Sequence, residues 1–288
     1  MKDIEYWIWL SRIEGLNPKF LNDLLEKYKD PKIIWRKTKE ELIAEEIKED
    51  YAKEITNSIY RENLNKYLKY MNENSIEIIT IKDKEYPDKL KVIYDPPVVL
   101  YVKGNKNILN EKSMAIVGCR QCTKYGENVA KKLSYNLSLN NINVISGLAK
   151  GIDSFAHKGS LLAKGKTIAV VGCGLDRVYP EENKTLFSEI IKANGAIVSE
   201  YIIGTKPLAK NFPKRNRIIS GLANGVIVVE AREKSGTLIT VDFALEQGKT
   251  IYAVPGNIGN LNAYGTNKLI KQGAKIVTNM QDILEDLI

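Results

Sequence analysis

From Ser113 onward, short runs rich in Val and Ile alternate with amphipathic stretches, and this alternation constrains the fold more than any other feature. The strand-like runs span residues 114–117, 143–146, 167–171, 196–199, 226–229, 251–254 and 275–277. The amphipathic stretches span residues 125–139, 152–163, 182–193, 238–247 and 267–272. Nearly continuous apolar strands are typical of a sheet buried on both faces. Alternation of strand and helix indicates an α/β, Rossmann-like, doubly wound and mostly parallel sheet over residues 113–288.

The chain before Ser113 has a different character. Leu10, Ile13 and Leu16 begin an apolar series at helical spacing, and further helical patterns follow over 38–44 and 50–72. Residues 1–75 are therefore predicted to form a small all-helical domain of the sterile-alpha-motif or helix-hairpin-helix kind. Residues 76–112 contain two β-branched runs and several prolines, which predicts a connector whose extra strands join the sheet.

Charge is distributed unevenly along the chain. Residues 1–105 carry 19 Lys and Arg against 20 Asp and Glu, whereas residues 106–288 carry 24 against 15. The net charge of +8 thus comes entirely from the second part, which suggests a polyanionic partner such as a nucleic acid. No apolar run reaches the roughly 18 residues of a membrane span, so no membrane partner is expected. Three cysteines argue against a disulfide scaffold and fit a reduced, cytoplasmic location.

Glycines accompanied by Ser, Thr, Lys or Arg follow several of the predicted strands. Ligands of doubly wound folds bind beyond the carboxyl ends of the strands, where backbone N–H groups and helix N-termini attract anions. The sequence therefore predicts an anion site at this edge of the sheet. Its candidate residues are Gly118, Arg120, Ser146, Gly147, Lys150, Gly151, Ser235, Gly236 and Thr237.

The densest basic stretch, residues 212–217 (FPKRNR), precedes an apolar helical pattern. Cations at a helix N-terminus oppose the helix dipole unless an anion lies nearby, which favours a functional role for the stretch. The structural alternative is that an arginine pairs with an internal acid such as Glu200 or Glu230, and we expect this of at least one arginine.

The patterns of common cofactor sites are incomplete. Gly172 and Gly174 form part of a dinucleotide fingerprint, but Arg177 occupies the third glycine position and no P-loop is present. Cys119 and Cys122 form a single CxxC without a second one, so no metal is predicted. Asp153 and His157 are best interpreted as a helix-capping acid and a packed histidine. No cofactor and no catalytic residue are predicted.

Several long motifs resemble those of the DNA-processing protein A family, also called DprA or Smf. They are residues 114–120 (MAIVGCR), 146–157 (SGLAKGIDSFAH), 167–186, 199–221, 235–240 (SGTLIT) and 252–274. The resemblance implies a protein that binds and protects single-stranded DNA and loads a RecA-type recombinase on it in natural transformation. It also implies a homodimer formed through the Rossmann-like domain, and no enzymatic activity. Many members carry a C-terminal winged helix, which this sequence is expected to lack.

The resemblance also implies roles for particular residues. Gly118 and Arg120 fall on the family's Gly-Ser-Arg element, with Cys119 in place of Ser. The YPxxN element brings Asn183, followed by Lys184 and Phe187 as a phosphate contact beside a stacking ring. The remaining elements place Phe212, Arg215, Asn216, Arg217, Ser235, Gly236 and Thr237 in the DNA site.

Two other functions compete with this interpretation. Related Rossmann-like enzymes that cleave nucleoside monophosphates carry a PGGxGTxxE loop, but Thr240 stands here in place of the catalytic Glu, and a threonine is no general acid or base near neutral pH. A nucleotide sensor using the same phosphate loops is the second alternative, and an adaptor with weak DNA affinity is a minor one.

Overall fold

A computed structural model describes residues 3–287, and within them nine strands form one mixed sheet. The strand order is β1-β2-β6-β5-β4-β3-β7-β8-β9. The strands are β1 (Ile76–Thr80), β2 (Val99–Gly104), β3 (Ser113–Val117), β4 (Asn143–Ser146), β5 (Thr167–Val170), β6 (Ala196–Ser199), β7 (Gly225–Val228), β8 (Thr250–Ala253) and β9 (Lys275–Ile276). Strands β3 to β9 pair in parallel, whereas β2 pairs antiparallel with both β6 and β1. The predicted doubly wound sheet and its additional connector strands are confirmed.

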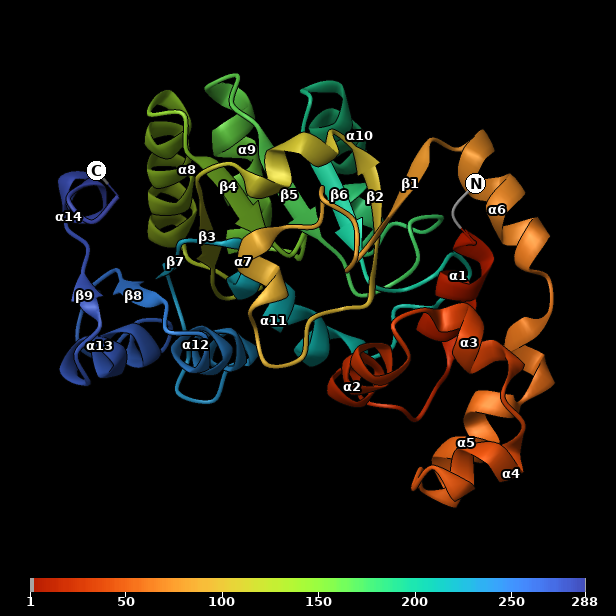
Figure 1. The fold of residues 1–288 in the computed structure, drawn as a ribbon. Coiled ribbons are helices and arrows are strands. Elements are labelled where there is room, and N and C mark those ends of the chain that lie inside the picture. Colours follow the sequence, from red (N-terminus) through yellow and green to blue (C-terminus); the bar gives the residue numbers. More distant parts are fainter. Residues whose placement is uncertain (1–2, 288) are drawn as a thin grey trace.

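Helices cover both faces of the sheet (Figure 1). One face carries α8 (Lys124–Leu139), α9 (Ile152–Leu162) and α10 (Lys184–Lys192). The other carries α7 (Asp88–Lys91), α11 (Asn211–Leu222), α12 (Gly236–Glu246) and α13 (Tyr264–Lys271), with α14 (Gln281–Leu284) near the C-terminus. Two 3-10 turns, η2 (Lys106–Asn110) and η3 (Glu181–Asn183), complete this part. The single helix predicted over 182–193 is thus divided into η3 and α10, and α13 begins three residues before the predicted 267–272.

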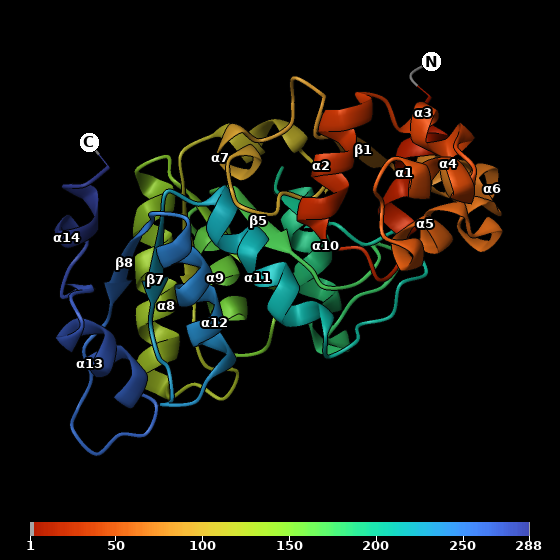
Figure 2. The same cartoon turned by 60° about the horizontal axis from the view of Figure 1, so that its bottom comes forward.

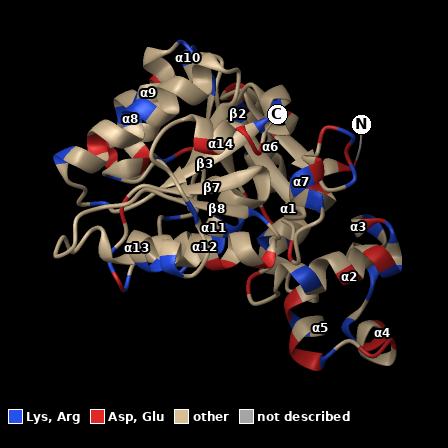
Figure 3. Cartoon of the chain, turned by 90° about the vertical axis from the view of Figure 1, so that its left-hand side faces the viewer, with Lys and Arg blue, Asp and Glu red and all other residues tan. Residues whose placement is uncertain are grey.

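The N-terminal part is helical, as predicted. It contains α1 (Ile4–Arg12), α2 (Pro18–Tyr28), α3 (Pro31–Arg36), α4 (Lys39–Ala44), α5 (Glu49–Thr56), η1 (Ser58–Arg61) and α6 (Leu64–Glu73). Side-chain caps explain where several of these helices start: Asn17 accepts a hydrogen bond from the Phe20 N–H ahead of Pro18, and Thr38 forms a capping box with Glu41. Figure 3 shows Asp and Glu on α5, and both basic and acidic residues on the helices around the sheet.

The N-terminal helices share one hydrophobic core with the sheet. Trp9 and Leu10 of α1 are fully buried in the same cluster as Tyr101 and Val102 of β2. The Ser11 hydroxyl also lies 2.8 Å from the Tyr101 hydroxyl. Figure 2 shows α1 and α2 packed beside the sheet on the side of β1 and β2. The antiparallel strands therefore connect the helical part to the Rossmann-like part. None of the described helices combines the length and apolar character that crossing a membrane requires.

Candidate functional site

A cleft of about 610 Å³ opens at the carboxyl ends of β3 and β7. The chain leaves β3 toward α8 on one face and leaves β7 toward α12 on the other, so this is the topological switch point at which ligands of such sheets bind. Eight of the predicted residues line it, namely Gly118, Arg120, Phe212, Arg215, Asn216, Ser235, Gly236 and Thr237. We call this space the switch-point cleft.

The lining of the switch-point cleft is strongly cationic. Arg120, Arg215, Arg232 and Lys234 line it against a single carboxylate, that of Asp153. Arg120, Arg232 and Lys234 are exposed. Sequence reasoning missed Arg232 and Lys234, although both lie between the end of β7 and the SGT loop that it did identify. Such an excess of cations favours a ligand with several negative charges.

Arg215 is a cation fixed beneath the cleft. It is only 4% exposed, and its Nη1 donates to the carbonyl oxygen of Gly147 at 2.8 Å and to that of Val170. Burial lowers the pKa of Arg215 to about 10, against the opposing charge of Asp153. The guanidinium therefore remains charged at neutral pH.

Ala149 of the β4–α9 turn lines the switch-point cleft, but Ser146, Gly147 and Gly151 do not. The Ser146 hydroxyl is fully buried and donates to the Ile116 carbonyl at 2.7 Å. The Gly147 N–H donates to Asp153 at 3.1 Å, and a Cβ at position 147 would come within 2.6 Å of Arg215 Nη2. Gly151 has φ +76° and packs against the backbone of residues 119–120. The predicted phosphate contacts of Ser146, Gly147 and Gly151 are therefore wrong. The Ser146 hydroxyl and the Gly147 N–H are used in hydrogen bonds within the protein, and protein backbone packs against Gly151.

Two aromatic rings lie at the rim of the switch-point cleft. The Tyr179 and Phe212 ring centroids are 5.5 Å apart at 41°, and the Arg120 guanidinium carbon lies 5.6 Å from the Phe212 centroid. Tyr179 is 43% exposed. An aromatic pair beside a cation is a surface on which an unpaired base can stack. Tyr179 was not among the predicted site residues, although it begins the YPxxN element that drew attention to Asn183.

Of the three site residues predicted at the start of α10, namely Asn183, Lys184 and Phe187, only Lys184 has a free position at the surface. Asn183 Nδ2 donates to the Leu148 carbonyl at 2.8 Å and to the Ser154 hydroxyl at 2.9 Å, so its side chain holds neighbouring loops together. Lys184 is exposed. Phe187 is only 7% exposed because it shares the buried face of α10 with Leu186 and Ile190. The expected stacking role of Phe187 is thus corrected, since its ring packs in the core.

Lys150 lies on the surface of the β4–α9 turn. Its ammonium group forms an ion pair with Glu182. A phosphate contact at Lys150 therefore requires this exposed pair to open.

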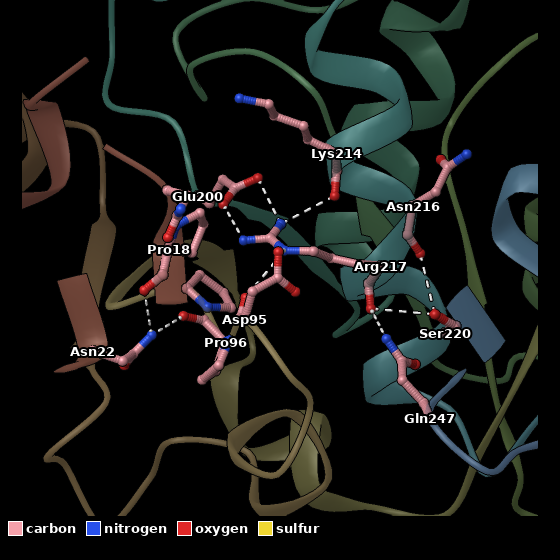
Figure 4. A network of polar contacts seen from close by, with 12 residues as sticks. Pro18, Asn22, Asp95, Pro96, Glu200, Lys214, Asn216, Arg217, Ser220 and Gln247 are labelled. Carbon is pink, nitrogen blue, oxygen red and sulfur yellow. Dashed lines mark hydrogen bonds and ion pairs between the residues drawn. The ribbon is translucent and has the colours of Figure 1, made fainter. Parts of the chain in front are cut away.

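Arg217 lies outside the switch-point cleft and forms a buried ionic network (Figure 4). It is 2% exposed, its Nη2 is 2.7 Å from Glu200 Oε2, and its Nε is 3.0 Å from Asp95 Oδ2. Burial alone would lower the pKa of Arg217, but the two carboxylates outweigh it and raise that pKa. The prediction that one arginine pairs with an internal acid is confirmed for Glu200, and the placement of Arg217 in the DNA site is corrected. Glu230 instead accepts hydrogen bonds from Thr123.

The single histidine is packed and neutral, as expected. His157 is fully buried, with Nδ1 2.7 Å from the Thr167 hydroxyl, and burial lowers its pKa to about 3. Asp153 accepts from the turn N–H groups rather than from His157. Among residues 3–287, no group of three or more His, Cys, Asp or Glu side chains is placed to hold a metal ion.

This chain is similar to known proteins in sequence and in fold. The family model for DNA recombination-mediator protein A matches residues 77–288. The DNA processing protein DprA of Bacillus subtilis is 46% identical over 216 residues, which are 75% of this chain and 72% of the relative. The X-ray structure of DprA from Streptococcus pneumoniae superposes with a TM-score of 0.79 at 37% identity and covers 99% of this chain and 98% of its own. DprA from Helicobacter pylori, whose structure concerns a single-stranded DNA binding mode, has a TM-score of 0.66 at 30% identity over 74% of this chain and 97% of its own.

Proposed function

This chain belongs to the DNA recombination-mediator protein A family, and we propose that it binds single-stranded DNA in the switch-point cleft without sequence preference. The observation that carries the proposal is the composition of one continuous site. Four cations face a single carboxylate there, and the Tyr179–Phe212 pair lies at the rim. Polyanion binding explains the cations, and unpaired bases explain the exposed ring.

Each part of the cleft then has a task. Arg120, Arg232 and Lys234 contact phosphate oxygens from the surface, while Arg215 contributes its charge from below. The Ser235 hydroxyl accepts a hydrogen bond from the Thr237 N–H and caps α12. Gly236, the first residue of α12, is exposed, and a phosphate approaches the N-terminus of the helix there. Tyr179 stacks on a base. Lys184, at the start of α10, contacts the strand as it approaches the cleft.

The proposed biological role is to protect incoming single strands and to hand them to a RecA-type recombinase during recombination and natural transformation. We also propose a homodimer formed through the Rossmann-like part. Large apolar side chains are exposed near the carboxyl end of β8, a feature typical of association surfaces. They are Ile258, Leu261 and Tyr264, with Ile276 on the edge strand β9. A cross-linking or light-scattering measurement of the full chain tests the dimer.

The proposal includes no hydrolytic step. Thr240 lines the cleft and is 2% exposed, and a hydroxyl there cannot act as the general acid or base of a nucleotide hydrolase. The single lining carboxylate, Asp153, already accepts hydrogen bonds from Gly147 and Ala149. An assay for base release from nucleoside monophosphates is expected to give no product.

Fluorescence anisotropy with labelled oligo-dT of increasing length, beside the matching duplex and at two salt concentrations, tests the function. Affinity is expected to rise with length, to fall with salt and to favour single strands. Binding of a free nucleotide without length dependence would instead identify a nucleotide sensor. If no oligonucleotide binds at low salt, the proposal is wrong. A recombinase-loading assay on coated single strands then tests the hand-over.

A further inference from the structure

A second cleft, of about 730 Å³, lies between the N-terminal helices and residues 200–214. We propose that it continues the DNA path, with Lys206, Lys210 and Lys214 holding the phosphates of a strand that leaves the switch-point cleft. This inference rests on the proposed function and extends it to a second subsite. We call this space the interdomain cleft.

Residues 205–214 form a ridge between the two clefts. Its two sides differ in composition. The residues that line the switch-point cleft are Pro207, Ala209, Phe212 and Pro213. The residues that line the interdomain cleft include Lys206, Leu208, Lys210 and Lys214. Because Phe212 and Lys214 belong to the same turn of α11, a strand stacked at Phe212 needs to cross only one helical turn to reach Lys214, the nearest of the three lysines in sequence.

The charges of the interdomain cleft leave these lysines without compensation. Arg12, Lys206, Lys210, Lys214 and Arg217 line it against the carboxylates of Glu14, Asp95 and Glu200. Two of these carboxylates are already paired with Arg217, whereas the described residues provide no ion pair to any of the three lysines. Figure 4 shows the Lys214 side chain extending away from the Arg217 network. A ligand with several negative charges would neutralise the three exposed lysines.

The walls of the interdomain cleft are held in place before any ligand binds. Asn22 Nδ2 of α2 donates to the Pro96 carbonyl at 2.8 Å and to the Pro18 carbonyl at 2.7 Å. Asp95, the neighbour of Pro96, pairs with Arg217 of α11 (Figure 4). The helical wall is thus connected to the lysine-bearing wall through partly buried polar contacts, so that binding a ligand costs little additional ordering of the two walls.

The chemistry of the wall favours a phosphodiester chain over a single phosphate group. Lysine ammonium groups are flexible point charges, and Lys206, Lys210 and Lys214 follow one another at intervals of four residues along the ridge. Arg12, the cation suited to bidentate contact, already donates to the Tyr60 and Glu62 carbonyls at 2.8 and 2.7 Å. Distributed lysines track a backbone.

The test compares two triple variants of the full chain in oligo-dT binding at several salt concentrations. In the K206Q/K210Q/K214Q variant, the slope of log affinity against log salt for long oligonucleotides should shrink by up to about 2, because each lost contact accounts for about 0.7. The shortest oligonucleotides that bind should retain the parent affinity, since they occupy only the switch-point cleft. The matched control replaces Lys132, Lys164 and Lys192 with Gln, three lysines outside both clefts, and should keep the parent slope. K206R/K210R/K214R should also keep it.

The outcomes separate this inference from the proposed function. If the parent binds long single strands and the ridge variant has an unchanged slope, the interdomain subsite is wrong while the proposed function stands. If the ridge variant loses short and long oligonucleotides equally, the lysines serve the switch-point cleft and the continuation is again wrong. If the parent binds no oligonucleotide, the proposed function itself fails. Thermal unfolding of each variant shows whether the fold is intact.

Discussion

Helix α11 presents two buried arginines to two different regions of the molecule. Arg215 and Arg217 are two positions apart, about 200° around a helix with 3.6 residues per turn, so they face opposite sides. Arg217 faces the interdomain cleft and is paired with Glu200 and Asp95. Arg215 faces the switch-point cleft, where Asp153 is the single lining carboxylate.

The two environments have opposite effects on the two guanidinium groups. The carboxylates around Arg217 raise its pKa, whereas burial lowers that of Arg215 to about 10. A buried cation whose charge is fully compensated by the protein has a structural role. A buried cation that the protein compensates only in part can still attract an external anion. The comparison therefore indicates which of the two arginines of this motif serves the ligand, a distinction that the motif itself does not make.

The largest expected effect is on stability. Arg217→Met should lower the free energy of unfolding by about 3–5 kcal/mol, because Glu200 and Asp95 would remain in a largely buried position without their cation. Urea unfolding measures this loss. The double variant R217M/E200Q should recover part of it. Arg215→Met should cost less stability, because Asp153 keeps its two backbone N–H donors. Equal losses for the two arginines would contradict the comparison.

The second effect is a pH dependence of the folding stability that arises from His157, whose environment includes Arg215. Burial, and then the charge of Arg215, lower the pKa of His157 to about 3. His157 Nε2 has no partner among the described residues. The unfolded chain therefore binds a proton below about pH 6.5 that the folded chain rejects. The corresponding stability is present above pH 6.5 and is lost as the pH falls, by about 2 kcal/mol at pH 5.

His157→Asn isolates this contribution from the carboxylates that titrate in the same range. His157 is the only histidine of the sequence, and an asparagine amide can still donate to the Thr167 hydroxyl. Urea unfolding at pH 7 and pH 5 should show a smaller difference for the variant than for the parent. A variant with the same pH dependence as the parent would rule out the buried neutral histidine.

Much of the fold followed from local sequence patterns. The strands could be predicted because buried parallel strands are continuous Val and Ile runs, and β4 and β6 have the predicted bounds. That the site lies at the carboxyl edge of the sheet could be predicted from the fold class, whereas its position between β3 and β7 required the strand order of the structure. The pairing of an arginine with Glu200 could also be predicted, because a buried charge requires a partner.

The assignment of individual side chains depended on helix phase and tertiary contacts that local patterns do not contain. The family resemblance implied a stacking role for Phe187 beside Lys184, but the apolar face of α10 includes Leu186 and Ile190 and takes Phe187 into the core. Arg217 appeared equivalent to Arg215 until the start of α11 fixed which side each faces. Tyr179 belongs to the YPxxN element, but its position beside Phe212 could be recognised only from the tertiary structure.

The third prediction separates stacking from charge in the switch-point cleft. Tyr179→Ala should weaken oligo-dT binding by about 1 kcal/mol, at the lower end of the range for one stacked base, without changing the salt slope. Tyr179→Phe retains the ring and should bind like the parent. Anisotropy titrations at several salt concentrations measure both quantities. A variant in which the slope falls while the affinity at low salt is kept would show that Tyr179 acts through the phosphates and not through a base.

The smallest expected effect tests the phosphate contacts of single residues on the switch-point side of α11. Arg120→Gln should reduce the slope of log affinity against log salt by about 0.7, the contribution of one phosphate contact with a single strand, and should weaken all sequences alike. Lys184→Gln is expected to do the same. Arg217→Met, measured where it remains folded, should leave the slope unchanged because its charge is compensated inside the protein. If Arg217→Met reduces the slope and Arg120→Gln does not, the strand binds in the interdomain cleft and not in the switch-point cleft, and the proposed primary site is wrong.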